Sequence, residues 1–350
     1  MGLVALLGAG LLGGCEADEF DALDGLEDLE QDRLQGSCPQ TSPGVWMRQG
    51  FESFPVGTPA LSDEKSFKKL FCTALHYIKG FGADAEKVPS SAQAKADMEA
   101  REAAGQYNGA SDQVRVTVAE GSEAHAGNKS LRVTYIDGGN TSSHSGAQYT
   151  EYISGTKRYD TKTGEISGDH APEQMYVSYW VKLEDDFLWQ HGGKLPGMIA
   201  EQAFRHPDRD ERVNSRLMWR EDGKLEFYLH TAYDERVRLF WDNGQEIDGH
   251  AALTRGQWHH IEFRMKLNDV DNGQAVANGE LEGWLDGEHA GLYTDLTFRV
   301  DPEININTFF FSTFFGGSSG DGTIQWWPSR DVYAWFDEIQ LSDHRLGPAQ

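Results

Sequence analysis

The sequence is poor in basic residues relative to acidic ones. Only 31 Lys and Arg residues stand against 56 Asp and Glu residues, which gives a net charge of -25 over 350 residues. So acidic a surface repels nucleic acid and excludes that class of partner. It also repels acidic polysaccharides, unless positive charge is concentrated in one part of the fold.

Several motifs of familiar enzyme classes are also absent. The chain contains no His-Glu-x-x-His, no nucleophile elbow and no P-loop. No predicted strand carries carboxylates at alternate positions flanking one face, as a retaining glycosidase of a sandwich fold requires. Glu280 and Glu282 come nearest, but they precede a Trp-Leu-Asp-Gly turn. A hydrolase is therefore disfavoured.

The first residues resemble an export signal. Residues 1–14 carry no charge and consist mostly of Leu, Ala, Val and Gly, a run too short to span a membrane but typical of a signal-peptide core. Two small residues precede Cys15, as in a bacterial lipobox, although no Lys or Arg precedes the run. We predict a signal peptide over residues 1–15 and a lipid anchor on Cys15, with the protein in the cell envelope, at the outer membrane or cell surface. An ordinary secretory signal with a chance cysteine is the alternative.

An acidic tether is predicted over residues 16–43. Residues 16–33 hold nine acids and one base and little that could be buried; cation binding is the alternative. Cys38 and Cys72 form an even pair in an exported chain, which predicts a disulfide. Two free buried thiols are equally compatible, because the sequence does not show whether the two residues meet in space.

Residues 44–345 are predicted to form one all-β domain. Short alternating segments follow one another from Val114 to Leu341, separated by turn signals such as Asp222-Gly223. Many short strands with such turns predict a sandwich or barrel. Residues 256–263 and 279–287 look like the strand pair common in concanavalin-like sandwiches, so the predicted fold is a concanavalin-like β-jelly-roll.

A small helical insertion is predicted at about residues 62–105. Residues 92–104 are rich in Ala, Glu and Lys, which favour helix. Apolar residues before them recur at helical spacing, at Phe67, Leu70, Phe71 and Leu75.

The most informative segment is an aromatic strand and loop, residues 179–189, followed by a glycine-rich turn. This turn reads Gly192-Gly193-Lys194-Leu195-Pro196-Gly197. Glycine lets a backbone approach a ligand closely, and proline stiffens the turn. With these residues, the chain resembles polysaccharide lyase family 14 and its jelly-roll relatives. The resemblance extends over about residues 44–342, apart from the helical insertion, and includes residues 215–220, 225–230, 311–318 and 333–337.

The resemblance implies a lyase that cleaves a uronate-containing polysaccharide, such as alginate or glucuronan, by β-elimination. This reaction removes the C5 proton of the sugar, protonates the leaving oxygen at C4, and requires the uronate carboxylate to be neutralised. The family motif implies Lys194 and Arg216 as catalytic residues. Asn214 replaces a family serine, and Tyr228 with His230 replaces a Tyr-x-Tyr pair; asparagine still bonds a carboxylate and histidine still transfers protons. The chemistry requires no cofactor.

Strand periodicity groups the same residues. Asn214 and Arg216 are two positions apart and share one face of a strand; Tyr228 and His230 share one face of the next. The Asp222-Gly223 turn makes the two strands neighbours. We expect these four residues to line one concave face, with the lysine of the glycine-rich turn over it.

Two further residues are predicted to bind substrate, Arg220 at the end of the first strand and Trp189 in the aromatic loop. Residues 194–238 contain nine bases and nine acids, so this part of an acidic chain is neutral and could admit a polyanion. The alternative is that the charges form surface pairs, with Arg216 and Arg220 as surface charges and Tyr228 as a packing residue.

A structural calcium ion is a further prediction. In jelly-roll carbohydrate proteins the first and last strands often share a calcium held by carboxylates and backbone oxygens. Glu52 and Asp337 lie in the predicted first and last strands; carboxylates without a metal are the alternative.

The leading function is thus a polysaccharide lyase, a monomer whose partners are an acidic polysaccharide and, through the lipid anchor, a membrane. The runner-up is a non-catalytic glycan-binding protein on the same fold. In that case tryptophan rings could stack on sugars, with Trp180, Trp189, Trp219, Trp326 and Trp327 as candidates.

Overall fold

The computed structural model describes residues 44–52, 56, 75–79, 115–139, 142, 145–153, 156–159, 166–202, 213–231, 236–240, 251–316 and 326–348. They belong to a compact unit of residues 39–350; the other unit, residues 1–38, lies outside the described residues. The predictions for Cys15, Cys38 and Cys72, the signal peptide and the tether also fall outside them and stay predictions. In the described ranges, no helix is long and apolar enough to cross a membrane.

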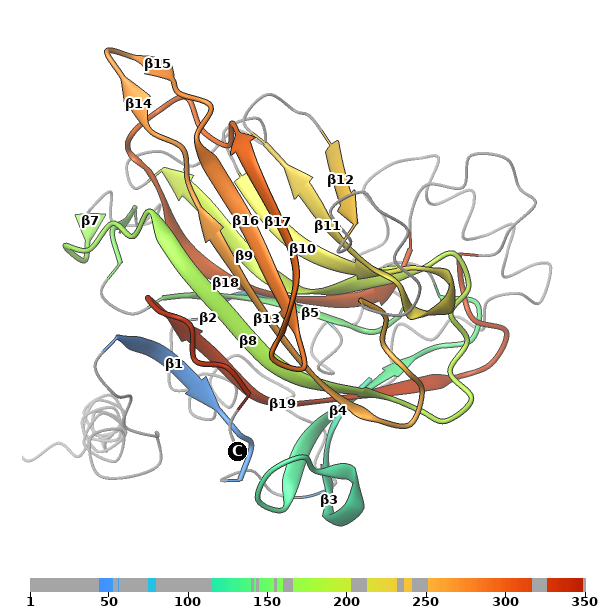
Figure 1. The fold of residues 1–350 in the computed structure, drawn as a ribbon. Helices are drawn as coiled ribbons and strands as arrows, with labels where there is room; N and C mark the ends of the chain where they lie inside the picture. The colour runs from blue at the N-terminus through green and yellow to red at the C-terminus, as the bar shows by residue number, and fades with distance from the viewer. Residues whose placement is uncertain are drawn as a thin grey trace, which may run out of the picture. The chain divides into compact units, whose positions relative to one another are not determined.

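Two antiparallel sheets pack face to face (Figure 1). The eight-stranded sheet has the order β17-β16-β13-β8-β19-β4-β3, with β1 paired to β19. Its strands are β1 (Val45–Gln49), β3 (Val116–Glu120), β4 (Lys129–Tyr135), β8 (Gln174–Leu183), β13 (Trp258–Lys266), β16 (Gly279–Leu285), β17 (Glu288–Leu296) and β19 (Val332–Ser342). This arrangement confirms the predicted all-β sandwich.

The seven-stranded sheet has the order β12-β11-β10-β9-β18-β5-β2. Its strands are β2 (Leu75–Lys79), β5 (Ala147–Tyr152), β9 (Gly193–Gln202), β10 (Val213–Trp219), β11 (Leu225–His230), β12 (Arg236–Phe240) and β18 (Ile304–Phe315). Two short ribbons lie apart from both sheets, β6 (Arg158–Tyr159) with β7 (Ile166–Ser167) and β14 (Val270–Asp271) with β15 (Gln274–Ala275).

Aromatic rings from both sheets fill the space between them. Phe311 of β18 meets Phe336 of β19 with ring centroids 5.0 Å apart. Tyr135 of β4 meets Phe315 and Trp219 at 5.4 and 5.7 Å. Because side chains alternate along a strand, burying one set of residues in this core directs the other set to the outer face of each sheet.

The predicted glycine-rich turn is wrong, because Gly193–Gln202 form the central strand β9. Pro196 has no N–H to donate to a ladder, and the register with β10 leaves it as an extra residue between Leu195 and Gly197, which is a bulge. Gly193 and Gly197 allow close packing within and beneath the sheet. A Cβ on Gly193 would lie 2.2 Å from the ring of Trp219.

The prediction of a helical insertion is also wrong in the part of it that the structure describes, residues 75–79. Leu75–Lys79 form β2, which pairs with β5 as an edge strand, so Leu75 belongs to a sheet rather than to a helix. Pairing with an available edge outweighs the helical spacing of a few apolar residues. The rest of residues 62–105 lies outside the described residues.

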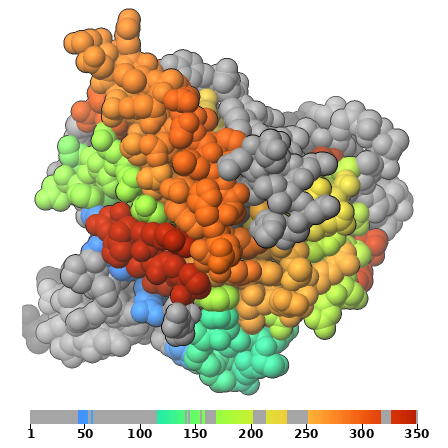
Figure 2. Space-filling view, in the orientation of Figure 1, coloured from blue at the N-terminus to red at the C-terminus, as the bar shows by residue number. Residues whose placement is uncertain are grey.

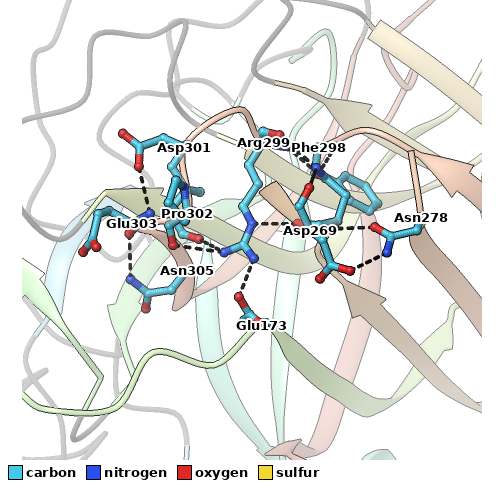
Figure 3. A network of polar contacts seen from close by, with 11 residues as sticks. Glu173, Asp269, Asn278, Phe298, Arg299, Asp301, Pro302, Glu303 and Asn305 are labelled. Atoms are coloured by element: carbon cyan, nitrogen blue, oxygen red, sulfur yellow. Dashed lines mark hydrogen bonds and ion pairs between the residues drawn. The ribbon is translucent and has the colours of Figure 1, made fainter. Parts of the chain in front are cut away.

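The connection from β17 to β18 carries the chain from one sheet to the other, and Arg299 secures it (Figure 3). The Arg299 side chain is buried; its Nε donates to the carbonyl oxygen of Asn268 at 2.9 Å and its Nη1 to that of Ile304 at 2.6 Å. An ion pair with Glu173 completes the set. These bonds fix where β18 begins, beside β9 in the seven-stranded sheet.

The last described residues cover part of the outer face of the eight-stranded sheet. In the space-filling view, the red C-terminal segment lies against orange residues of β16 and β17 (Figure 2). Arg345 donates to the carbonyl oxygen of Gly287 at 2.6 Å. The backbone N–H groups of Leu346 and Gly347 bond the buried carboxylate of Glu262.

Candidate active site

Three neighbouring strands of the seven-stranded sheet, β9, β10 and β11, carry the predicted catalytic residues. Asn214 stands opposite His230 and Arg216 opposite Tyr228, with β10 and β11 antiparallel. Their alternate neighbours, among them Leu217 and Phe227, are buried in the core. The four predicted residues therefore share the outer face of the sheet, which confirms the predicted strand pairing and facing.

Arg216 is largely buried on this face and lies against rings and a hydroxyl group. Its guanidinium donates to the hydroxyl oxygen of Ser312 at 3.1 Å. Its central carbon lies 4.9 Å from the ring centroid of Phe310 and 5.6 Å from that of Tyr228. Burial lowers the pKa of Arg216 to about 10, and Tyr228 offsets part of this effect; the side chain remains charged at neutral pH.

No carboxylate in the described part of the chain pairs with this arginine. Its Nε atom is buried and has no hydrogen-bond partner there, and neither has the side-chain oxygen of Asn214, two positions away. A buried charge without a counter-ion is costly. The face therefore offers a positive charge and an amide group to an anion from outside the fold.

Lys194 lies in strand β9 rather than in a turn, and its side chain lies on the predicted face, over the ring of Tyr228. It stands opposite Met218 of β10, and its ammonium group lies 2.8 Å from the Met218 sulfur and 3.4 Å from the ring centroid of Tyr228. The side chain is buried. A cation over an aromatic face is attracted electrostatically, so Lys194 is held directly beside Tyr228.

His230 completes the group at the end of β11. Its ring lies 5.1 Å from that of Tyr228 in a T-shaped arrangement. The two side chains able to transfer protons therefore lie side by side, and the cations of Lys194 and Arg216 also lie beside the tyrosine ring. This set can bind a carboxylate and move protons next to it.

Arg220 has a partner within the protein. It forms an ion pair with the buried carboxylate of Glu226 and donates to the carbonyl oxygen of His191 at 3.3 Å. Trp189 packs at 5.5 Å from Phe187 and under the guanidinium of Arg255. Within the described ranges, neither forms a hydrogen bond or ion pair with Asn214, Arg216, Tyr228 or His230, and their binding roles stay predictions.

Sequence reasoning missed three residues of this face. Met218 lies two positions after Arg216, and the periodicity that grouped Asn214 with Arg216 also includes it. Phe310 and Ser312 come from β18, almost 100 residues further along the chain, and only the sheet order β10-β9-β18 brings them here. No local pattern in the sequence predicts that Phe310 and Ser312 lie beside Arg216.

Glu52 and Asp337 do not fit a calcium site. Glu52 follows β1 rather than lying in it, and its carboxylate accepts the N–H groups of Asn128 and Lys129 at 2.8 and 2.9 Å. Asp337 accepts the N–H groups of His125, Ala126 and Glu338. Both carboxylates face backbone donors, which repel a cation. Within the described ranges, no three His, Cys, Asp or Glu residues gather where they could hold a metal.

The candidate stacking tryptophans fall into different places. Trp219 is fully buried in the core and cannot stack on a sugar. Trp180 lies on the other sheet, where His125 already stacks on it at 3.6 Å. Trp326 lies 4.9 Å from His191.

The family model of polysaccharide lyase 14 matches residues 123–339, more than half of the chain. The chain belongs to the polysaccharide lyase 14 family. The matched segment contains all five predicted catalytic residues of this family member. No curated protein sequence matches it.

Solved structures show the same fold at low sequence identity. The marine PL-14 alginate lyase from Aplysia kurodai is 18% identical, with a TM-score of 0.54 over 87% of this chain and 99% of that one. A mutant of alginate lyase Aly36B in complex with alginate tetrasaccharide is 15% identical, with a TM-score of 0.50 over 88% and 100%. The endo-beta-1,4-glucuronan lyase from the fungus Trichoderma reesei is 16% identical, with a TM-score of 0.43 over 66% and 88%.

Proposed function

We propose that this member of the family is a polysaccharide lyase that cleaves a uronate-containing polymer by β-elimination. The observation that carries the proposal is that Arg216 lacks a partner of opposite charge. The Arg216 side chain is largely buried, it bonds a neutral hydroxyl, and the described residues supply no carboxylate for it.

A uronate carboxylate would supply the negative charge that Arg216 lacks among the described residues. It accepts charge-assisted hydrogen bonds from a guanidinium and from an amide, which are stronger than bonds between neutral groups. Arg216 and Asn214 lie two positions apart on one face, so both can reach one carboxylate. Lys194 adds a second positive charge one strand away.

The elimination then requires only groups already on the face. A base removes the C5 proton, the electron pair forms the C4–C5 double bond, the C4–O bond breaks, and the leaving oxygen takes a proton. Arg216, Asn214 and Lys194 stabilise the negative charge that develops on the carboxylate side of the sugar. Tyr228 and His230 take the C5 proton and return one to the leaving oxygen.

Alginate is the polymer to test first, because two similar solved structures are described as alginate lyases; glucuronan is the second, as the family resemblance implies. Purified protein is incubated with alginate, polyglucuronate, pectate and a neutral glucan, and the ultraviolet absorbance of the new double bond is followed. We expect product from at least one uronate polymer and none from the glucan, and Lys194→Ala should lower the rate about 100- to 1000-fold.

A glycan-binding protein on the same fold is the alternative outcome of this test. It predicts no unsaturated product from any polymer, together with binding of a uronate polymer that Arg216→Ala weakens. That result would contradict the lyase and leave the face as a binding site. The observation that favours this alternative is that His230 replaces the second tyrosine of the family pattern.

A further inference from the structure

A row of alternating aromatic and basic side chains crosses the outer face of the eight-stranded sheet, the face opposite to the candidate active site. The strand register places Trp258 beside Lys182, Lys182 beside Trp335, and Trp335 beside Arg132. Thr117 of β3 ends the row opposite Arg132. Neighbouring strands lie about 4.8 Å apart, so five strands give a row of roughly 19 Å.

The two cations of this row are held by rings and a hydroxyl group. The Lys182 ammonium lies 5.4 Å from the ring centroid of Trp335. The Arg132 guanidinium lies 5.5 Å from the ring of Tyr333, and its Nε donates to the Thr117 hydroxyl at 3.2 Å. Within the described ranges, neither cation pairs with a carboxylate.

Other basic residues of the same sheet have carboxylate partners. Arg264 pairs with Glu280 and Glu282, and Lys266 also pairs with Glu280. On a chain with a net charge of -25, two cations on either side of Trp335, without an acidic partner among the described residues, form a local region of positive charge. Such a region attracts polyanions.

The rings beside these cations remain partly accessible. Trp258, Lys182, Arg132 and Tyr333 are all partly exposed, whereas Trp335 lies buried between the two cations. Aromatic rings offer flat apolar surface and basic groups offer charge-assisted hydrogen bonds. An elongated ligand with flat rings and carboxylates matches both features.

We propose that the row Trp258–Lys182–Trp335–Arg132 is a second, non-catalytic binding site for an acidic polysaccharide. The ligand class rests on the proposed function; the site itself rests on the register and charges of the eight-stranded sheet. The row holds a polymer on one face of the sandwich while the other face acts on a chain.

Retardation in native gels containing alginate or polyglucuronate tests this site, with mobility normalised to a gel without polymer. Proteins carry Arg216→Ala, so that neither cleavage nor the first site dominates. Lys182→Gln is compared with Lys266→Gln, because both remove one lysine charge from the same sheet face. We expect Lys182→Gln to weaken binding about tenfold, Arg132→Gln with Lys182→Gln to weaken it further, and Lys266→Gln to change nothing.

Equal retardation of the Lys182→Gln and Lys266→Gln proteins would overturn the second site, as would equal retardation by a neutral glucan. Thermal unfolding of each variant verifies the fold; if the double variant does not fold, Lys182→Gln alone decides. Product formation is measured separately on wild type. Binding that depends on Lys182 without any product supports the second site and refutes only the lyase, whereas product without such binding refutes only the second site.

Discussion

Each sheet of the sandwich carries an arginine opposite a tyrosine on its outer face, and the two arginines have different surroundings. Arg216 stands opposite Tyr228 in the seven-stranded sheet, and Arg264 stands opposite Tyr176 in the eight-stranded sheet. The Arg264 guanidinium lies 2.5 Å from the carboxylate of Glu280 and 3.0 Å from that of Glu282. Among the described residues, the Arg216 guanidinium bonds a serine hydroxyl but no carboxylate, and it lies against two aromatic rings.

The difference separates a charge that stabilises the fold from a charge that serves a ligand. The charge of Arg264 is neutralised inside the protein by two carboxylates, and removing it leaves those carboxylates without that partner. An arginine without a carboxylate keeps donors for an anion from outside. The same cross-strand pair of residue types therefore has a structural role on one sheet and a proposed catalytic role on the other.

The largest expected effect comes from removing one hydroxyl group on each side of the comparison. Tyr228→Phe should lower turnover of a uronate polymer about 100- to 10,000-fold, because positioned proton transfer contributes that much. Tyr176→Phe, the matched change beside Arg264, should leave turnover unchanged. Rates of unsaturated product formation check both, and equal losses in the two variants would contradict the assignment.

A carboxylate placed beside Arg216 should make it resemble Arg264. Ser312 is fully buried and bonds the guanidinium at 3.1 Å, so Ser312→Asp supplies an internal counter-ion. We expect polymer turnover to fall about 10- to 100-fold, since the substrate carboxylate loses a charged hydrogen bond. Ser312→Asn, of similar size but neutral, is the control; the account fails if both variants lose the same activity.

A smaller effect is expected at the residue that departs from the family pattern. His230→Tyr restores the pair of tyrosines on β11 and should keep turnover or raise it, because a tyrosine can also transfer protons. His230→Ala should lower it. The kcat of the His230→Tyr and His230→Ala variants is measured as a function of pH. Loss of activity in His230→Tyr would show that the histidine is specifically required.

The smallest effect concerns the buried carboxylate of Asp337, which forms no ion pair within the described ranges. Burial raises the pKa of Asp337 to about 7, although the N–H groups around it oppose the shift. Because the folded protein then binds a proton more tightly than the unfolded chain, Asp337 lowers stability increasingly as pH rises from about 4 to 7. The Tm of Asp337→Asn minus that of wild type should therefore increase over this interval; a constant or decreasing difference would contradict the argument.

The sequence allowed the fold class and one part of the site to be predicted. Alternation in β10 and β11 and the Asp222-Gly223 turn were enough to predict that Arg216 and Tyr228 share one face of adjacent strands, because both signals are local; the exact pairing comes from the structure. The family resemblance identifies Lys194. The sequence predicts a turn around it, because glycines and a proline normally break strands, and only the register shows that Pro196 occupies a bulge within a strand.

Contacts between distant parts of the chain could not be predicted. Ser312 reaches Arg216, and Asp337 reaches the N–H groups of residues 125–126, through the order of strands in the sheets. The ion pair of Arg220 with Glu226 is of another kind, because it joins residues only six positions apart across the predicted turn.

Exchanging each arginine of the comparison for methionine tests the central claim most directly. Polymer turnover and the free energy of unfolding in urea are measured for Arg216→Met and Arg264→Met. The account predicts that Arg216→Met lowers turnover about 100- to 1000-fold without loss of stability, and that Arg264→Met keeps turnover but loses about 1–3 kcal/mol of stability. An Arg216→Met protein that is destabilised like Arg264→Met and still fully active would contradict it.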